Sequence, residues 1–176
     1  CDALKLPKVV SEEAAGLFAE AAKKHGGTRF KNGGLICDLL PTIVASIHCA
    51  SLLSFSACTI NEILAVVEEG AGATLKKATE ALKKVKEANR SRRIPSLDAE
   101  ALLPRMCGVH MGLAVDVEEK SLCLVRDIKR LGICCEPATA AAVAILWHLS
   151  GTAPAKGGSW LAKASEASGK SEQNLS

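Results

Sequence analysis

The run of 23 residues from Leu39 to Asn61, which contains no formal charge, constrains the fold of this chain more than any other feature. Fourteen of these residues are apolar, so the segment has to be removed from water. Its length would allow it to span a bilayer. Pro41, His48, Asn61 and four serines argue against a lipid-facing helix. We therefore expect a central helix, beginning near Pro41, that is buried inside a helical bundle.

Most of the apolar side chains are small. Alanine occurs 28 times, whereas the aromatic residues are three Phe and two Trp, without Tyr. Alanine is the best helix former and is depleted in strands, and long alternations of Val, Ile and Thr are missing. The sequence therefore predicts an all-α fold, a disulfide-stapled bundle of about five to six helices.

Caps and glycines place the other helices. Ser11 is a suitable N-cap for the first helix, and Thr59 and Glu62 have the spacing of a capping box. Long helices are expected over 74–90 and 109–131, and a last strong one begins at Pro137. We expect a single domain over 1–151 and a flexible arm or linker over 152–176. The expected inward stripe of helix 74–90 is Leu75, Ala78, Leu82 and Val85.

Eight cysteines are well above ordinary usage for 176 residues. Because zinc-type pairs such as C-x-x-C are missing, no metal is expected, and the even number favours four disulfides in an oxidising compartment: secreted, cell-surface or organelle lumen. The rise of a helix keeps cysteines of one helix too far apart to be bridged. Antiparallel pairing of the two halves then predicts the bridges Cys37–Cys134, Cys49–Cys123, Cys58–Cys107 and Cys1–Cys135.

The segment CDLLPTIVASIHCASLLSFSAC, from Cys37 to Cys58, resembles alanine-rich cysteine-helix proteins of dinoflagellate algae. In those proteins a cysteine opens an Ala/Ser/Val-rich helix and another closes it. The region from Cys107 to Cys134 is similar to a looser second copy, although the additional cysteines and the charged residues 118–120 depart from the pattern. The family has no assigned activity. The resemblance implies a plastid lumen or attachment to a membrane complex as a further setting.

A basic face is expected on the helix over 74–90, offset by Glu80 and Glu87. Aromatic and base-reading residues are not interleaved with its charges, so nucleic acid is not an expected partner. A solvated helix face is the simplest interpretation, and an acidic protein surface or, less favoured, a membrane surface is the alternative. The residues of this face are Lys76, Lys77, Lys83, Lys84, Lys86 and Arg90.

Motifs for catalysis are weak. Cys107-x-x-His110 and the adjacent pair His48-Cys49 combine a thiol with an imidazole, but no Asp or Asn is placed to orient either imidazole. The glycines lack the spacing of phosphate-binding loops, and Trp147 is expected to pack in the core. We therefore expect neither an enzyme nor a cofactor.

These observations favour a non-catalytic, protein-binding or structural subunit. We expect it to be surface-exposed, secreted, or an accessory subunit of a larger assembly such as a plastid photosynthetic complex. The first alternative is a carrier of a small apolar ligand, held in a cavity lined by residues 39–60. The second alternative is a cysteine-dependent enzyme.

Overall fold

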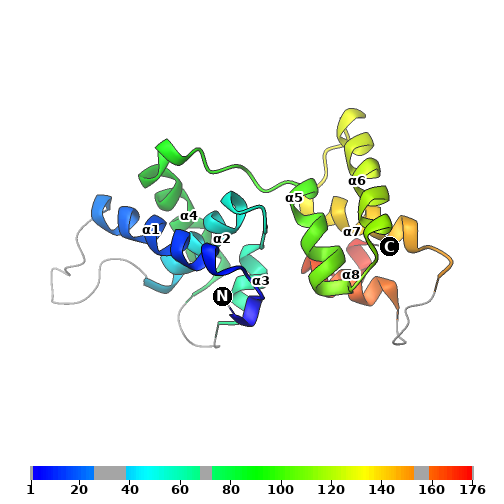
Figure 1. Cartoon of the computed structure of the whole chain (residues 1–176), viewed down its shortest axis with the longest axis horizontal. Helices are drawn as coiled ribbons and strands as arrows, with labels where there is room; N and C mark the ends of the chain where they lie inside the picture. Colours follow the sequence, from blue (N-terminus) through cyan, green and yellow to red (C-terminus); the bar gives the residue numbers. More distant parts are fainter. Residues whose placement is uncertain (1, 26–38, 68–72, 153–158, 176) are drawn as a thin grey trace. The chain divides into compact units, whose positions relative to one another are not determined.

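The computed structural model describes residues 2–25, 39–67, 73–152 and 159–175. Within these ranges the chain forms eight α-helices and no strand, which confirms the all-α prediction. The chain divides into two compact units, unit 1 (Cys1–Ser96) and unit 2 (Leu97–Ser176), which run from blue to green and from green to red in Figure 1. In place of one domain over 1–151 with a flexible arm, the division therefore falls after Ser96, and part of the expected arm is helical.

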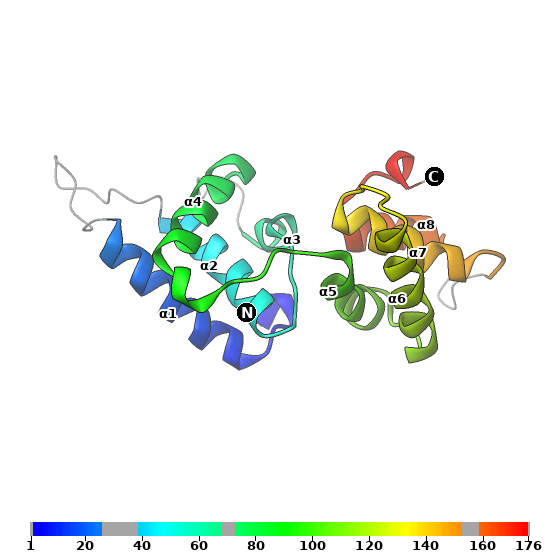
Figure 2. The ribbon, with the colours of Figure 1, turned by 90° about the horizontal axis from the view of Figure 1, so that it is seen from above.

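Unit 1 is built on three helices that pack against one another: α1 (Lys8–Lys24), α2 (Leu39–Leu53) and α4 (Leu75–Ala88). Figure 2 shows α2 between α1 and α4. The short helix α3 (Ile60–Ala65) contacts α2 and α4. A 3-10 turn, η1 (Asp2–Leu4), precedes α1, and another, η2 (Arg90–Arg92), follows α4. The core between the helices includes the fully buried side chains of Val10, Leu17, Val44, Ile63 and Val85.

The uncharged run forms α2 and the first two residues of α3, with the chain turning between the two helices. At the turn, Phe55 has a positive φ of 53° and its side chain is 91% exposed. The predicted capping box is present, because the Glu62 amide donates to Thr59 Oγ1 over 3.1 Å and the Thr59 amide donates to Glu62 Oε2 over 3.3 Å. No helix among the described residues combines the length and the hydropathy needed to cross a membrane.

Two expectations about unit 1 helices are corrected. The first helix begins at Lys8 rather than after Ser11, whose hydroxyl instead donates to the Lys8 carbonyl over 2.8 Å. In α4, Ala78 and Val85 are buried as expected, but Leu75 is 51% exposed. The buried arc of α4 is centred on Ala78, Ala81 and Val85, and the successive 100° steps of a helix place Leu75 on its flank.

Unit 2 contains α5 (Ala99–Pro104), α6 (Val115–Arg130), α7 (Pro137–Leu149) and α8 (Trp160–Ser168). Helix α7 contacts the other three, and its buried residues are mostly alanines, whose small side chains permit close approach. Helix α8 lies in the segment expected to be a flexible arm. A 3-10 turn, η4 (Glu172–Asn174), follows it. Trp147, which we expected in the core, is 69% exposed.

The helix predicted over 109–131 is divided in the structure. Arg105–Met111 forms a π-helical segment, η3, and α6 begins only at Val115. Gly112 ends η3 in the left-handed region, with φ of 63°, where glycine is favoured because a side chain would be strained. The apolar spacing of this region does not distinguish a π-helix from an α-helix.

The described cysteines form no disulfide with one another, so the staples Cys49–Cys123 and Cys58–Cys107 are not formed. Each of the two helices concerned packs mainly within its own unit, α2 on α1 and α4, and α6 on α7 and α5. Cys49 and Cys58 belong instead to the core of unit 1. The bridges Cys37–Cys134 and Cys1–Cys135 each involve a residue outside the described ranges.

Candidate functional site

An apolar groove lies between α1 and α2 in unit 1 and has a volume of about 320 Å³. The α2 side carries Leu39, Ile43 and Ile47, which are spaced four residues apart and therefore share one face of the helix. The residues that line the groove from α1 are Ser11, Ala14, Ala15 and Phe18, and Ser46 adds a hydroxyl from α2.

The part of α2 that reaches the surface is apolar. Most of the helix is buried, and none of its residues is charged. Its partly exposed residues include Leu39, with 43% of its surface exposed, and the half-buried Ile43 and Ile47. A surface helix normally places polar residues toward water. The groove side of α2 therefore has the character of a helix face that another apolar element covers.

The α1 side of the groove differs from the α2 side. Ser11 and Ala15 are exposed and small, so the backbone of a second helix can come close to α1. Lys8 and Glu12, at positions next to this face, form an exposed ion pair of 3.9 Å. The groove thus combines aliphatic side chains on one wall, small side chains on the other, and charges at its margin.

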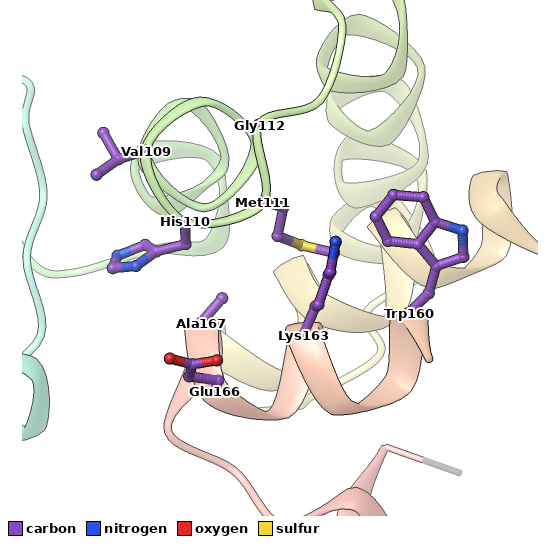
Figure 3. A pocket seen from close by; sticks show the side chains of 8 residues that line it. All are labelled: Val109, His110, Met111, Gly112, Trp160, Lys163, Glu166 and Ala167. Carbon is purple, nitrogen blue, oxygen red and sulfur yellow. The ribbon is translucent and has the colours of Figure 1, made fainter. Parts of the chain in front are cut away.

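A second cavity, of about 530 Å³, lies entirely within unit 2 (Figure 3). One wall is the end of η3, and the other is α8, which packs against η3. The π-helical turn is closed by a hydrogen bond of 2.8 Å from the Leu113 amide to the Cys107 carbonyl. Such turns occur frequently at functional sites. The lining residues are Val109, His110, Met111, Gly112, Trp160, Lys163, Glu166 and Ala167.

The charged groups of this cavity are separated. Lys163 Nζ lies 5.0 Å from the centroid of the Trp160 ring, within the range of a cation–π contact. Trp160 Nε1 donates to Thr152 Oγ1 over 3.0 Å, which satisfies the only donor of the indole. Figure 3 shows Lys163 and Trp160 toward one end, Glu166 and His110 toward the other, and Met111 between them.

The two thiol–imidazole motifs do not form activated nucleophiles. Burial raises the pKa of Cys49 to about 11 and that of Cys107 to about 12, so both thiols are protonated at neutral pH, whereas a nucleophile requires the thiolate. The neighbouring His48 is buried, and its Nδ1 donates to the Cys58 carbonyl over 2.7 Å. His110 is exposed at the unit 2 cavity, while Cys107 is buried.

The basic face predicted on α4 lies at the surface. Lys76, Lys77, Lys83 and Lys84 are exposed, and Lys86 is half-buried with its ammonium donating to the Pro95 carbonyl over 3.4 Å. Glu87, on the same helix, pairs with Lys24 of α1 over 3.3 Å. No group of three or more His, Cys, Asp or Glu side chains suited to a metal ion occurs among the described residues.

The sequence analysis identified one wall of the unit 1 groove and one wall of the unit 2 cavity. It placed an apolar ligand beside residues 39–60 but did not find the α1 wall, because Ser11, Ala14 and Ala15 are ordinary residues of an amphipathic helix. It singled out His110 but not α8, whose signals were the N-cap Ser159 and the C-terminal Gly169. The chain matches no known family model and no curated protein sequence, so the dinoflagellate resemblance stays a prediction.

Proposed function

We propose that the chain is a non-catalytic protein-binding subunit and that the groove between α1 and α2 binds an amphipathic helix of a partner protein. The observation that carries the proposal is the apolar surface strip of α2, Leu39, Ile43 and Ile47. Helix-in-groove recognition uses apolar anchors spaced three and four residues apart. A helix in this groove would pack beside α1 and α2 and would add a fourth long helix to unit 1.

The walls of the groove suit a helix better than an extended peptide. An extended segment gains much of its affinity from main-chain hydrogen bonds to a sheet edge, and the described residues contain no strand. The small residues Ser11 and Ala15 admit a helix backbone, while Ile43 and Ile47 are placed to interdigitate with its side chains. The ion pair between Lys8 and Glu12 supplies the polar rim that is typical of protein interfaces.

The first test is site-specific photocrosslinking in extracts of the source organism. A benzophenone side chain replaces Ile47 in the groove, and the matched control replaces Leu75, an exposed apolar residue of α4. We expect the Ile47 probe to attach to a segment with helical apolar periodicity and the Leu75 probe not to do so. Attachment of both probes to the same proteins would contradict the proposal.

The second test measures the affinity of a synthetic peptide that carries the crosslinked segment. Ala15→Arg fills the groove from an exposed position, and Ile43→Asp places a charge on its apolar wall. We expect each substitution to weaken binding by about tenfold or more, as for central interface residues, and Leu75→Asp to leave it unchanged. Circular dichroism confirms that each variant is folded. Unchanged affinity in Ala15→Arg would contradict the proposal.

A small apolar ligand is the second candidate, because the groove volume of about 320 Å³ lies at the lower end of the range for small-molecule sites. Native mass spectrometry of protein purified from the source distinguishes the two functions. A retained small molecule that Ala15→Arg abolishes supports the carrier, whereas a protein complex that the same variant abolishes supports the subunit.

The setting that we propose is an oxidising compartment, where the chain serves as an accessory subunit of a larger assembly. The support is the number of cysteines, eight in 176 residues. Peptide mapping without reduction, on protein from the source, tests the setting. Bridges that involve Cys1, Cys37 or the exposed Cys123, Cys134 and Cys135 are the expected result, and eight free thiols would contradict it.

A further inference from the structure

We propose that the cavity between η3 and α8 in unit 2 binds a small zwitterion, namely an ω-amino acid whose ammonium and carboxylate are joined by a short alkyl chain. This site is separate from the groove in unit 1, so the inference stands independently of the protein-binding function. Its volume of about 530 Å³ is within the range of small-molecule sites.

The first step concerns charge. Lys163 and Glu166 line the cavity from successive turns of α8, and neither forms an ion pair within the part of the chain that the structure describes. The Lys163 ammonium lies over the Trp160 ring, 5.0 Å from its centroid. The cavity therefore offers one cation and one anion, both available to a ligand. A ligand carboxylate is complementary to Lys163, and a ligand ammonium is complementary to Glu166.

The second step concerns spacing. Lys163 and Glu166 are three residues apart in a helix and so face the same side, yet they do not form a salt bridge with each other. Figure 3 shows their charged ends directed to different parts of the cavity, Lys163 beside Trp160 and Glu166 on the side of His110. A ligand that meets both needs separated charges. In an α-amino acid both charges are attached to one carbon, whereas an ω-amino acid has them at its ends.

The third step concerns the wall between the charges. Met111 is buried and supplies a thioether, and Ala167 is buried and supplies a methyl group. Trp160 presents its ring as an apolar surface, because its indole N–H is already bonded to Thr152. An alkyl chain fits these groups. A polyanion such as a nucleotide does not, because a single lysine would have to offset several negative charges beside the Glu166 carboxylate.

The experiment uses the full chain with Trp147→Phe, which leaves Trp160 as the single tryptophan because the sequence contains two. Trp147 is exposed and lies outside the cavity. We expect 6-aminohexanoate to change the Trp160 fluorescence with 1:1 saturation. Hexanoate and hexylamine, which each retain one charge, should bind at least about tenfold more weakly, and so should the isomer norleucine, whose charges are adjacent. Calorimetry provides a readout that does not depend on the fluorophore.

Matched variants localise the binding. Lys163→Met and Glu166→Gln should each weaken 6-aminohexanoate binding by about tenfold or more, since each leaves one ligand charge without a partner. Lys120→Met and Glu119→Gln make the same changes on the exposed surface of α6 and should have no effect. The proposal is overturned if 6-aminohexanoate fails to bind at millimolar concentration, if norleucine or hexanoate binds equally well, or if the α6 variants weaken binding as much as the α8 variants.

Discussion

His48 is a polar side chain placed in the core of unit 1 by the helix that carries it. Its ring is buried, and Nδ1 donates to the Cys58 carbonyl at the turn after α2. Burial lowers the pKa of His48 below its ordinary value of 6.5; the hydrogen bond to Cys58 acts in the opposite direction, and the charge of Lys86 adds to the decrease. The folded state therefore favours the neutral imidazole of His48 over the charged one.

This pKa predicts a dependence of stability on pH. Below pH 6.5 the unfolded chain binds a proton at His48 more readily than the folded chain does, so the free energy of unfolding should fall as the pH decreases. Above that value the contribution is constant. Urea unfolding between about pH 5 and about pH 7.5 measures the slope. His48→Asn, which retains a donor, should flatten it, and an unchanged slope would show that His48 does not titrate as inferred.

The six described cysteines divide into two classes by accessibility. Cys49, Cys58 and Cys107 are buried, whereas Cys123, Cys134 and Cys135 are exposed. We expect the exposed thiols of the reduced protein to react with an aromatic disulfide reagent within minutes and the buried ones to react only after denaturation. Mass spectrometric peptide mapping identifies the labelled positions. Rapid labelling of Cys49 or Cys107 in the native protein would contradict the raised pKa of these thiols.

At the scale of the elements, burial rather than residue type decides which leucines hold the helices together. Leu17 of α1 is fully buried in the core of unit 1, while Leu75 of α4 is half exposed. We expect Leu17→Ala to lower the free energy of unfolding by about 2–5 kcal/mol, because it leaves a cavity. The same substitution at Leu75 should change it by less than about 0.5 kcal/mol. Denaturant unfolding of both variants makes the comparison, and similar losses would place Leu75 in the core.

Helix α4 shows which part of a buried face its apolar spacing predicts correctly and which part it does not. The apolar spacing placed Val85 inward, which the structure confirms, but it also placed Leu75 there. A pattern gives the direction of the apolar face, and the neighbouring helices determine how much of that face they cover. Lys83 is exposed, and we expect Lys83→Ala to leave the free energy of unfolding nearly unchanged, as surface substitutions usually do.

At the scale of the whole molecule, the chain consists of two compact units with a boundary at Ser96 and Leu97. Each unit has its own buried side chains, such as Leu17 and Val85 in unit 1 and Leu103 and Ile145 in unit 2. The basic residues Arg92 and Arg93 precede the boundary and are exposed. This arrangement allows each unit to fold by itself.

We therefore predict that fragments 1–96 and 97–176 are each helical when produced separately. Their summed far-UV circular dichroism should equal that of the full chain, and each should unfold cooperatively. Cleavage of the fully reduced chain after Arg93 should release two fragments that keep this helical signal. An unfolded fragment would contradict the division.

The sequence by itself determined the fold class and most of the helices. The signals that predicted them are properties of short segments. They are the alanine content, the absence of strand alternation, and local signals such as the Thr59–Glu62 capping box. Because helical hydrogen bonds join residues four apart, those segments hold most of the information needed.

The tertiary structure alone decided how the helices associate within each unit. With that it decided the boundary after Ser96, the absence of disulfides among the described cysteines, the unit 1 groove and the unit 2 cavity. Cys49 and Cys123 are suitably spaced for a bridge only if α2 and α6 are neighbours, and each helix packs mainly within its own unit instead. Likewise Ser11 and Ile43, or Met111 and Lys163, meet across a groove or cavity through packing between helices distant in sequence. Such pairings follow from burial of apolar surface, which is non-directional, so the helical pattern does not specify them.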